Sequence, residues 1–207
     1  MLIRFIAHAG FAINEDDHLI LIDPWFRDST LENPLIEGIN RKKTIEFQIP
    51  PAVDRMEDFS PDVILLSHFH VHHAPFNDVH TLVSNSQGRV MLAHPDGYAN
   101  KIVTNRFGHF ADITIRPTKH RESFVSGPFT ITALSHTVEG HLAWSIKSRT
   151  GHVLHIADGA ANTDFTINAL HAYWEEFSEI RPDIVFLSAG RNSLRKEGDD
   201  KRQIIES

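Results

Sequence analysis

A short apolar run that leads directly into a cluster of histidines is the feature that most restricts what this chain can fold into. Residues 63–66 are apolar and β-branched at their start, and Pro61-Asp62 precedes them, so a buried strand is predicted there. Four histidines follow within six residues, at positions His68, His70, His72 and His73. Side chains two residues apart in a strand point the same way, so His68 and His70 can face one point in space.

The cluster has the composition of a metal site. Imidazole nitrogen suits zinc, iron, nickel and copper, and catalytic metal sites are commonly built at the end of a strand. A turn into a helix at Pro75 would let His72 and His73 fold back over the same point. The alternative is a solvated histidine-rich turn, because the chain holds 15 histidines in 207 residues. Exposed polar tracts do not usually follow a buried strand without a linker, so the position favours metal binding.

Length and composition limit the remaining possibilities. The 207 residues suit a single domain, here 1–207, with a substantial core. A net charge of −7 argues against a nucleic-acid-binding surface, and the lack of cysteine excludes disulfides and thiolate metal ligands. No apolar stretch approaches the roughly 18 residues of a membrane span. Acidic residues at 15–17 interrupt any signal-peptide core, so a cytoplasmic location is the default expectation.

The periodicity of the chain predicts a mixed α/β protein. Strands are predicted at residues 2–6, 11–13, 18–22, 63–66, 89–93, 112–115, 123–125, 128–134, 142–147, 152–156 and 183–187. Helices are predicted at residues 75–84, 96–105 and 166–177. The apolar segment 24–60 has no clean period and is interpreted as a flap over the site or an oligomer contact. The residues from Asn192 onward indicate a short exposed helix or a frayed tail.

Three further polar residues lie at the ends of predicted strands. His136 lies two residues beyond the alternating strand 128–134, and Asp158 lies two residues beyond strand 152–156, before a turn of small residues. Taken alone, His136 is interpreted as a surface histidine and Asp158 as a turn-stabilising carboxylate. His8, between the first two strands, is interpreted alone as structural.

Taken together, these segments resemble the metallo-β-lactamase superfamily. Residues 67–73 are similar to the HxHxDH signature of that family. Residues 5–11 followed by 21–25 are similar to the opening of its branch with ascorbate-phosphate lactonase-like and phospholipase D-like members. Residues 135–141 resemble the third metal-histidine segment, and residues 155–159 resemble the strand that delivers the bridging aspartate. The order and spacing of the segments agree along most of the chain.

The resemblance implies an α/β fold, a four-layer αββα sandwich with its site along one edge of the sheets. It also implies a binuclear metal site, whose ligands would be His68, His70 and His136 in site 1, His72 and His73 in site 2, and Asp158 between them. The cofactor would be one or two divalent transition metal ions per chain, with zinc favoured over iron or manganese. His8 would lie near the site, and Asp23 would orient ligand imidazoles by accepting their second N–H.

Two positions depart from the family pattern. His72 stands where the family has an aspartate, which leaves the site one charge unit more positive than in its relatives. No histidine follows His171, so the last metal histidine, expected after strand 183–187, has no counterpart here. Either the second metal site has one ligand fewer, or the closing element of the fold is missing from this chain. The interpretation assigns catalytic roles to His72 and Asp158, with water completing the second metal site.

The expected chemistry follows from the metal. Such ions lower the pKa of bound water to about 7, so the leading expectation is hydrolysis of an ester, lactone or phosphoester by a metal-bound hydroxide. An iron-dependent oxygen-using enzyme on the same fold is the second interpretation. A degenerate metal-binding protein without turnover is the third. The expected partner is a small-molecule substrate, with no nucleic acid and no membrane span, and a homo-oligomer is compatible with the sequence.

Overall fold

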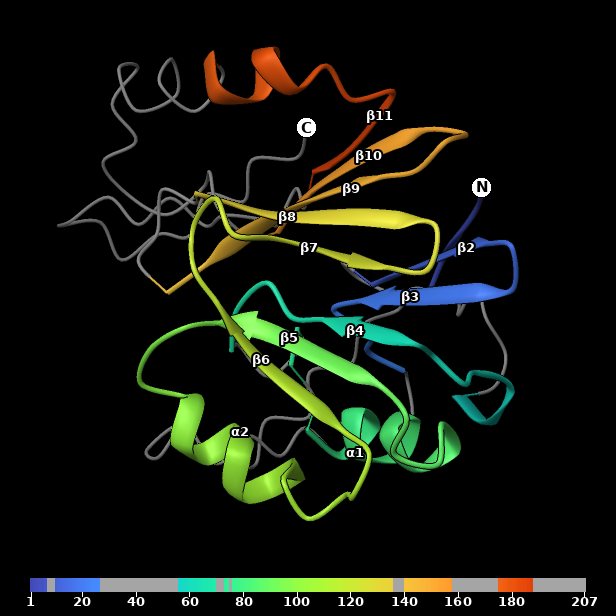
Figure 1. Cartoon of the computed structure of the whole chain (residues 1–207), viewed down its shortest axis with the longest axis vertical. Coiled ribbons are helices and arrows are strands. Elements are labelled where there is room, and N and C mark those ends of the chain that lie inside the picture. Colours follow the sequence, from blue (N-terminus) through green and yellow to red (C-terminus); the bar gives the residue numbers. More distant parts are fainter. Residues whose placement is uncertain are drawn as a thin grey trace, which may run out of the picture.

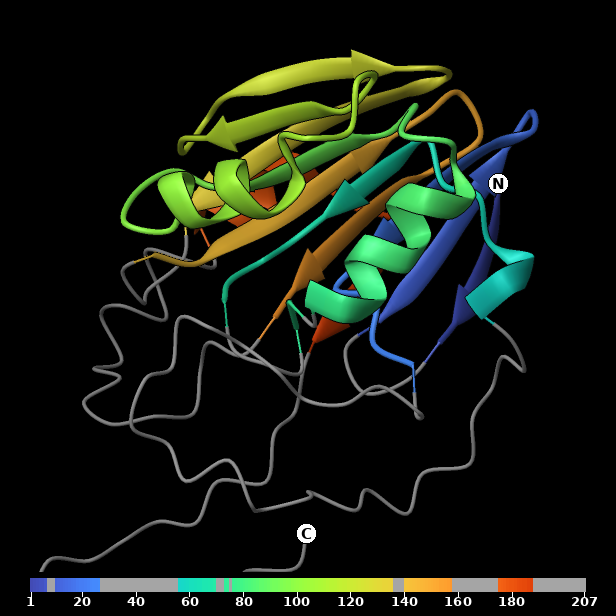
Figure 2. The ribbon, with the colours of Figure 1, turned by 90° about the horizontal axis from the view of Figure 1, so that it is seen from below.

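The computed structural model describes residues 1–6, 10–26, 56–69, 73–74, 76–135, 140–157 and 175–187. Within these ranges the strands form two sheets that lie face to face, and helices cover their outer faces (Figure 1). The view turned by 90° shows the same stacking, with two helices packed against one side of the sandwich (Figure 2).

The first sheet has six strands in the order β1-β2-β3-β4-β5-β6. Their bounds are Leu2–Phe5, Phe11–Glu15, His18–Ile22, Val63–Leu65, Met91–Pro95 and Thr114–Thr118. β1, β2 and β3 pair antiparallel, whereas β3, β4, β5 and β6 run parallel. Because β3, β4 and β5 are parallel, the residues that follow them meet at one edge of the sheet.

The second sheet has five strands in the order β11-β10-β9-β8-β7. From β7 to β11 their bounds are Ser123–Ser126, Phe129–Ser135, Leu142–Lys147, His152–Ile156 and Ile184–Leu187. Strands β7 to β10 pair antiparallel, and β11 joins β10 in parallel. The hairpin predicted over residues 142–156 is confirmed, with His152 paired to Lys147 at its closed end.

Helices α1 (Phe76–Asn85) and α2 (Asn100–Phe107) cover the outer face of the six-stranded sheet (Figures 1 and 2). A short 3-10 helix, Met56–Asp58, precedes β4. On the far side, residues 175–180 are helical and lie over the five-stranded sheet (Figure 1). The four-layer αββα sandwich is therefore confirmed. No helix among the described residues is long and apolar enough to cross a membrane.

The core explains why the central strands are apolar at every position. Val63 and Leu65 of β4 pack between the two sheets, whereas Ile64 and Leu66 pack under α1 and α2. A strand buried on both faces needs a continuous apolar run rather than an alternating one. A third cluster lies outside the second sheet, where Phe177 packs against residues of β8, β9 and β10.

Three predicted elements differ from the structure or fall outside it. The strand predicted at 112–115 is displaced to Thr114–Thr118 and contains Pro117, which is tolerated because β6 is an edge strand. The helix predicted at 166–177 lies mostly outside the described residues, and the described helix continues to Ile180. Residues 27–55 of the predicted flap and the tail from Asn192 also lie outside, and a single domain over 1–207 stays a prediction.

One buried histidine in the first sheet should make the stability of the fold depend on pH. His94 lies at the end of β5, fully buried, with Nδ1 2.9 Å from the Pro95 carbonyl oxygen. Its Nε2 has no hydrogen-bond partner among the described residues. Burial lowers the pKa of His94, although the Pro95 carbonyl and the Asp96 charge act in the opposite direction. The folded protein therefore holds this imidazole neutral.

We expect His94 to make the fold less stable in weak acid. The unfolded chain binds a proton at His94 near its ordinary pKa of about 6.5, whereas the folded chain binds it only at lower pH, so the unfolding free energy falls as pH drops below about 6.5. His94→Asn should weaken this decline in urea unfolding of chelator-treated protein. Asn105→Ala, a change at an exposed position that removes no titratable group, should keep the wild-type profile. Superimposable pH profiles for wild type and His94→Asn would contradict the assignment.

Candidate functional site

The site is built where β3 and β4 end, at the edge of the first sheet. Asp23 directly follows β3, and Ser67 and His68 come shortly after β4. The backbone N–H of Asp23 donates to the carbonyl of Leu65, 2.9 Å away, so the parallel pairing of the two strands continues to the carboxylate. The side chains of Asp23, Ser67, His68 and His73 are all buried.

Asp23 is the centre of this arrangement. Its Oδ1 accepts the backbone N–H of Ser67 at 2.7 Å, and its Oδ2 accepts the Ser67 hydroxyl at 2.5 Å and His73 Nδ1 at 2.8 Å. The residue has φ of 44°, in the left-handed region that aspartate tolerates better than most residues. Strain of this kind persists where surrounding contacts over-determine the conformation, as the three hydrogen bonds do here.

The hydrogen bonds fix which nitrogen of each imidazole carries the proton. His73 Nδ1 faces a carboxylate oxygen, so it is the donor of that bond. The Ser67 hydroxyl gives its only proton to Asp23, so at 2.9 Å it accepts from His68 Nδ1. In their neutral forms both rings therefore carry the proton on Nδ1 and the lone pair on Nε2.

Three imidazoles pack together around His68. Its ring centroid lies 4.1 Å from that of His73 and 4.1 Å from that of His141, with the His141 ring stacked at 22°. His141 is half-buried and precedes β9, after Gly140, whose φ of 76° turns the chain into that strand. The Leu142 N–H donates to the carbonyl of Ser67 at 2.8 Å, which ties the second sheet to the histidine segment.

The electrostatics of the site centre on a buried anion. Burial alone would raise the pKa of Asp23, but the charge and hydrogen bond of His73 outweigh it and hold the pKa below its usual range. The charge of His155 and the hydroxyl of Ser67 act in the same direction. His155 is buried at the end of β10, where its ring meets that of Phe11 edge-on at 5.7 Å.

The segment that follows Asp23 is anchored to the first helix. The N–H of Phe26 donates to the buried Asp78 carboxylate of α1 at 2.8 Å, and the Phe26 ring lies 5.5 Å from that of Phe59. Asp78 belongs to the first turn of α1, which begins two residues after Ala74. The end of β3 and the helix that follows the histidines are thus joined by a buried hydrogen bond.

The predicted site residues are only partly within the described ranges. His68 and His73 are brought together, and Asp23 accepts an imidazole N–H as the resemblance implied. The remaining predicted residues, His8, His70, His72, His136 and Asp158, lie outside the described residues. Among those described, no group of three or more histidine, aspartate or glutamate side chains is arranged to hold a metal ion.

Three described neighbours of the site were not assigned roles from the sequence. Ser67 is the first residue of the histidine segment. Its hydroxyl side chain directly precedes a histidine at a strand end, and this position could have identified it as a hydrogen-bond partner of that histidine. His141 belongs to segment 135–141, which resembles the third metal-histidine segment, but the resemblance implies no separate role for it. His155 occupies an inward-facing position at the end of a strand, and the alternation of β10 could have placed it near the site.

Comparison with known proteins gives the same fold. A family model described as "Beta-lactamase superfamily domain" matches residues 2–192. A possible metal-dependent hydrolase from Veillonella parvula is 16% identical, with a TM-score of 0.59, and the match covers 88% of this chain and 69% of that one. An isothiocyanate hydrolase from Delia radicum gut bacteria is also 16% identical, with a TM-score of 0.57 and coverage of 93% and 73%.

A larger enzyme shares the fold over part of its length. The diiron β-hydroxylase CmlA from Streptomyces venezuelae is 16% identical, with a TM-score of 0.52, over 83% of this chain and 32% of that one. The present chain thus spans about a third of CmlA. No curated protein matches the chain.

Removing the Asp23 side chain should destabilise the fold strongly. Asp23→Ala leaves the buried donors of Ser67 and His73 without their acceptor, and breaking a buried pair in this way costs about 3–5 kcal/mol. Asp16→Ala is the matched control, because Asp16 has a similar φ of 51° but is exposed. Asp16→Ala should lower the unfolding free energy by only about 1 kcal/mol, which is the backbone cost of holding alanine in the left-handed region.

Urea unfolding of chelator-treated protein measures both variants. Asp23→Asn is a useful third case, since asparagine tolerates the left-handed backbone and its loss of stability reports the missing carboxylate alone. Equal unfolding free energies for Asp23→Ala and Asp16→Ala would show that the network contributes nothing beyond backbone conformation.

Proposed function

Because the chain belongs to the beta-lactamase superfamily, we propose that it is a metal-dependent hydrolase acting on an ester, lactone or phosphoester of a small molecule. The observation that carries the proposal is the anchoring of two neighbouring imidazoles. His73 donates to Asp23 through Nδ1, and His68 donates to Ser67 through Nδ1. Ligand histidines in metal sites are held in this way, with the second nitrogen bonded to a carboxylate or another oxygen.

The donors that the chain offers fit a divalent transition metal. Both anchored rings present the Nε2 lone pair, which is the atom a metal ion would take. The residues that would hold it are His68 and His73, together with the predicted ligands His70, His72, His136 and Asp158. When bound, the metal supplies Lewis-acid activation of water and of the carbonyl or phosphoryl oxygen of the substrate.

The described residues contribute orientation and shielding. Asp23 fixes the ring of His73 and, through Ser67, the ring of His68. Neither imidazole therefore has to reorient when a metal ion binds. Burial of both rings keeps bulk water from their inner faces. Asp23 places a negative charge behind the ligands, which raises their basicity and favours a cation at the site. His141, half-buried and stacked on His68, forms the wall nearer to solvent.

Metal analysis is the direct test. Protein purified without a nickel column should contain one to two transition metal ions per chain, and these ions should be lost on chelation or below about pH 5.5, as the histidines protonate. Restoring zinc or manganese should restore hydrolysis of a lactone, an aryl ester or an aryl phosphodiester. Metal-free protein whose stability does not change on adding zinc, iron or manganese would refute the proposal.

The same measurement separates the alternatives. Iron with visible absorbance, together with oxygen consumption in place of hydrolysis, would favour an oxygen-using enzyme. A metal-loaded protein with no turnover across a broad panel would favour a binding protein. His73→Ala should lower metal content, whereas His120→Ala, at a half-exposed histidine paired with Glu176, should leave it unchanged.

His72 provides a sharper test of the second metal site. We propose that it is a ligand there and partly compensates for a late metal histidine, which does not directly follow strand 183–187. His72→Ala should then reduce the metal stoichiometry towards one, and His72→Asp should retain metal but shift its preference towards harder ions such as manganese. Identical metal content, metal preference and activity in wild type and both variants would make His72 a bystander.

A further inference from the structure

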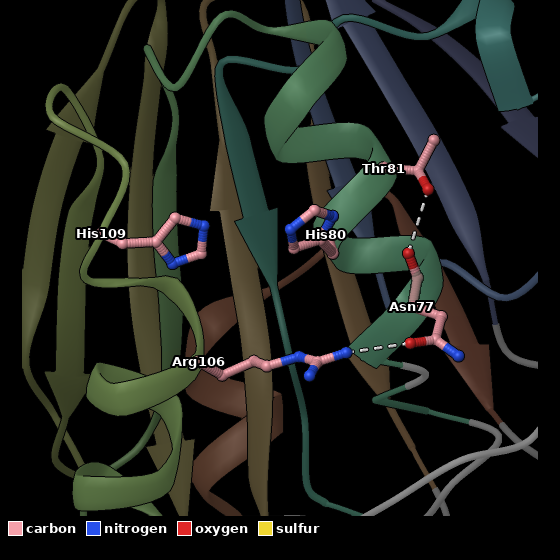
Figure 3. A pocket seen from close by; sticks show the side chains of 5 residues that line it. All are labelled: Asn77, His80, Thr81, Arg106 and His109. Atoms are coloured by element: carbon pink, nitrogen blue, oxygen red, sulfur yellow. Dashed lines mark hydrogen bonds between the residues drawn. The ribbon is translucent and has the colours of Figure 1, made fainter.

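A pocket of about 310 Å³ lies on the helical side of the first sheet, between α1 and α2. Its lining residues are Asn77, His80 and Thr81 from α1, Arg106 from α2 and His109 just after it. Figure 3 shows His80 and His109 pointing toward each other while Arg106 extends from α2 toward α1. None of the predicted metal ligands lines this pocket.

The pocket carries positive charge that no acidic side chain offsets within the described part of the chain. Arg106 Nη2 donates to the Asn77 side-chain oxygen at 3.1 Å, which is a neutral acceptor (Figure 3). Among the residues that the structure describes, Arg106 has no ion-pair partner, and no aspartate or glutamate lines the cavity. A guanidinium has five N–H donors, so one bond to Asn77 leaves most of its donor capacity for a ligand.

The two imidazoles of the pocket pack against each other and against the ring of Phe110. The ring centroids of His80 and His109 lie 5.9 Å apart with their planes at 29°. Phe110 packs against both, at 5.2 Å from His80 and 4.3 Å from His109. The two imidazoles therefore form a preformed part of the pocket wall, which also includes Arg106.

The local potential favours an anion over a metal cation. Burial lowers the pKa of His80, and the positive charges of Arg106 and His109 lower it further. A field that opposes protonation of an imidazole also opposes binding of a cation beside it. Two histidines are moreover fewer than the three or four protein ligands of an ordinary zinc site.

We propose that this pocket binds the phosphate group of a small molecule, with Arg106 as the main contact and His80 and His109 as N–H donors. A guanidinium fork matches the geometry of phosphate oxygens and forms charge-assisted hydrogen bonds with them. The volume lies at the lower end of the roughly 300–1,000 Å³ typical of ligand pockets. This volume leaves room for an organic part beside the phosphate.

The test is a titration with inorganic phosphate at constant ionic strength, followed through the NMR signals of the histidine rings. Saturable shifts at His80 and His109 are expected. Arg106→Gln should weaken binding about tenfold or more, because charge-assisted bonds from a guanidinium are the strong contacts at such a site. Arg106→Lys, which keeps the charge but loses the planar fork, should weaken binding less than Arg106→Gln.

Arg89→Gln is the matched control. Arg89 is also exposed and also donates through Nη2 to a side-chain amide oxygen, that of Gln87, at 3.1 Å. The Arg89→Gln variant should bind phosphate with the same affinity as the wild type. A repeat with phenylphosphonate distinguishes the source of the phosphate: tighter binding indicates an organic phosphate, and equal or weaker binding indicates the free ion.

Two results would overturn the proposal. One is equal affinity in Arg106→Gln and Arg89→Gln. The other is the absence of shifts at His80 and His109, including the case in which only the rings of His68 and His73 respond, which would place the phosphate at the strand ends instead. Thermal unfolding of each variant confirms that it is folded, and His109→Ala at an exposed position supplies a second loss-of-contact variant.

Discussion

The buried carboxylate of Asp23 is the constraint on which the rest of the site depends. A charge removed from water is tolerated only when its hydrogen bonds are complete, and here the backbone and hydroxyl of Ser67 and the ring of His73 complete them. These partners follow β4, while Asp23 follows β3. One ionised group thus sets the parallel register of two strands, the position at which the histidine segment begins, and the tautomers of two imidazole rings.

That dependence also links folding to function. A site that must hold several imidazoles close together has to overcome their mutual repulsion when they are protonated, and a buried anion behind them offsets part of it. The second sheet contributes through the Leu142–Ser67 backbone bond and through His141 and His155. The site therefore requires both sheets, although its anchor belongs to the first.

Much of the fold could be predicted from the sequence because central strands have strong local signals. Residues 63–66 are apolar at successive positions, and the structure buries them on both faces of β4. The predicted strand 112–115 ends before Pro117, because proline argues against a strand. The structure tolerates Pro117 within β6 only because β6 lies at the edge of the sheet. The αββα architecture came from the family resemblance, since periodicity indicates elements but not how two sheets face each other.

The site was predictable to a lesser degree. Clustered histidines and Asp23 are visible in the sequence, but the partner of each is not, because His73 and Asp23 lie fifty residues apart. The contribution of Ser67 depends on the direction of one hydroxyl proton, and that of His141 on the stacking of two rings from different sheets. The pocket between α1 and α2 likewise joins residues whose spacing, from Asn77 to His109, follows no motif.

The proline in β6 also affects how copies of this chain can meet. An outer strand exposes unpaired amide and carbonyl groups, on which a strand of another molecule can add. Pro117, the fourth residue of β6, removes one of those donors, and the guanidinium of the neighbouring Arg116 lies over the ring of Phe124 at 4.7 Å. Pro117 therefore interrupts the row of donors that an added strand would need, which opposes continuous strand pairing along this edge of the first sheet.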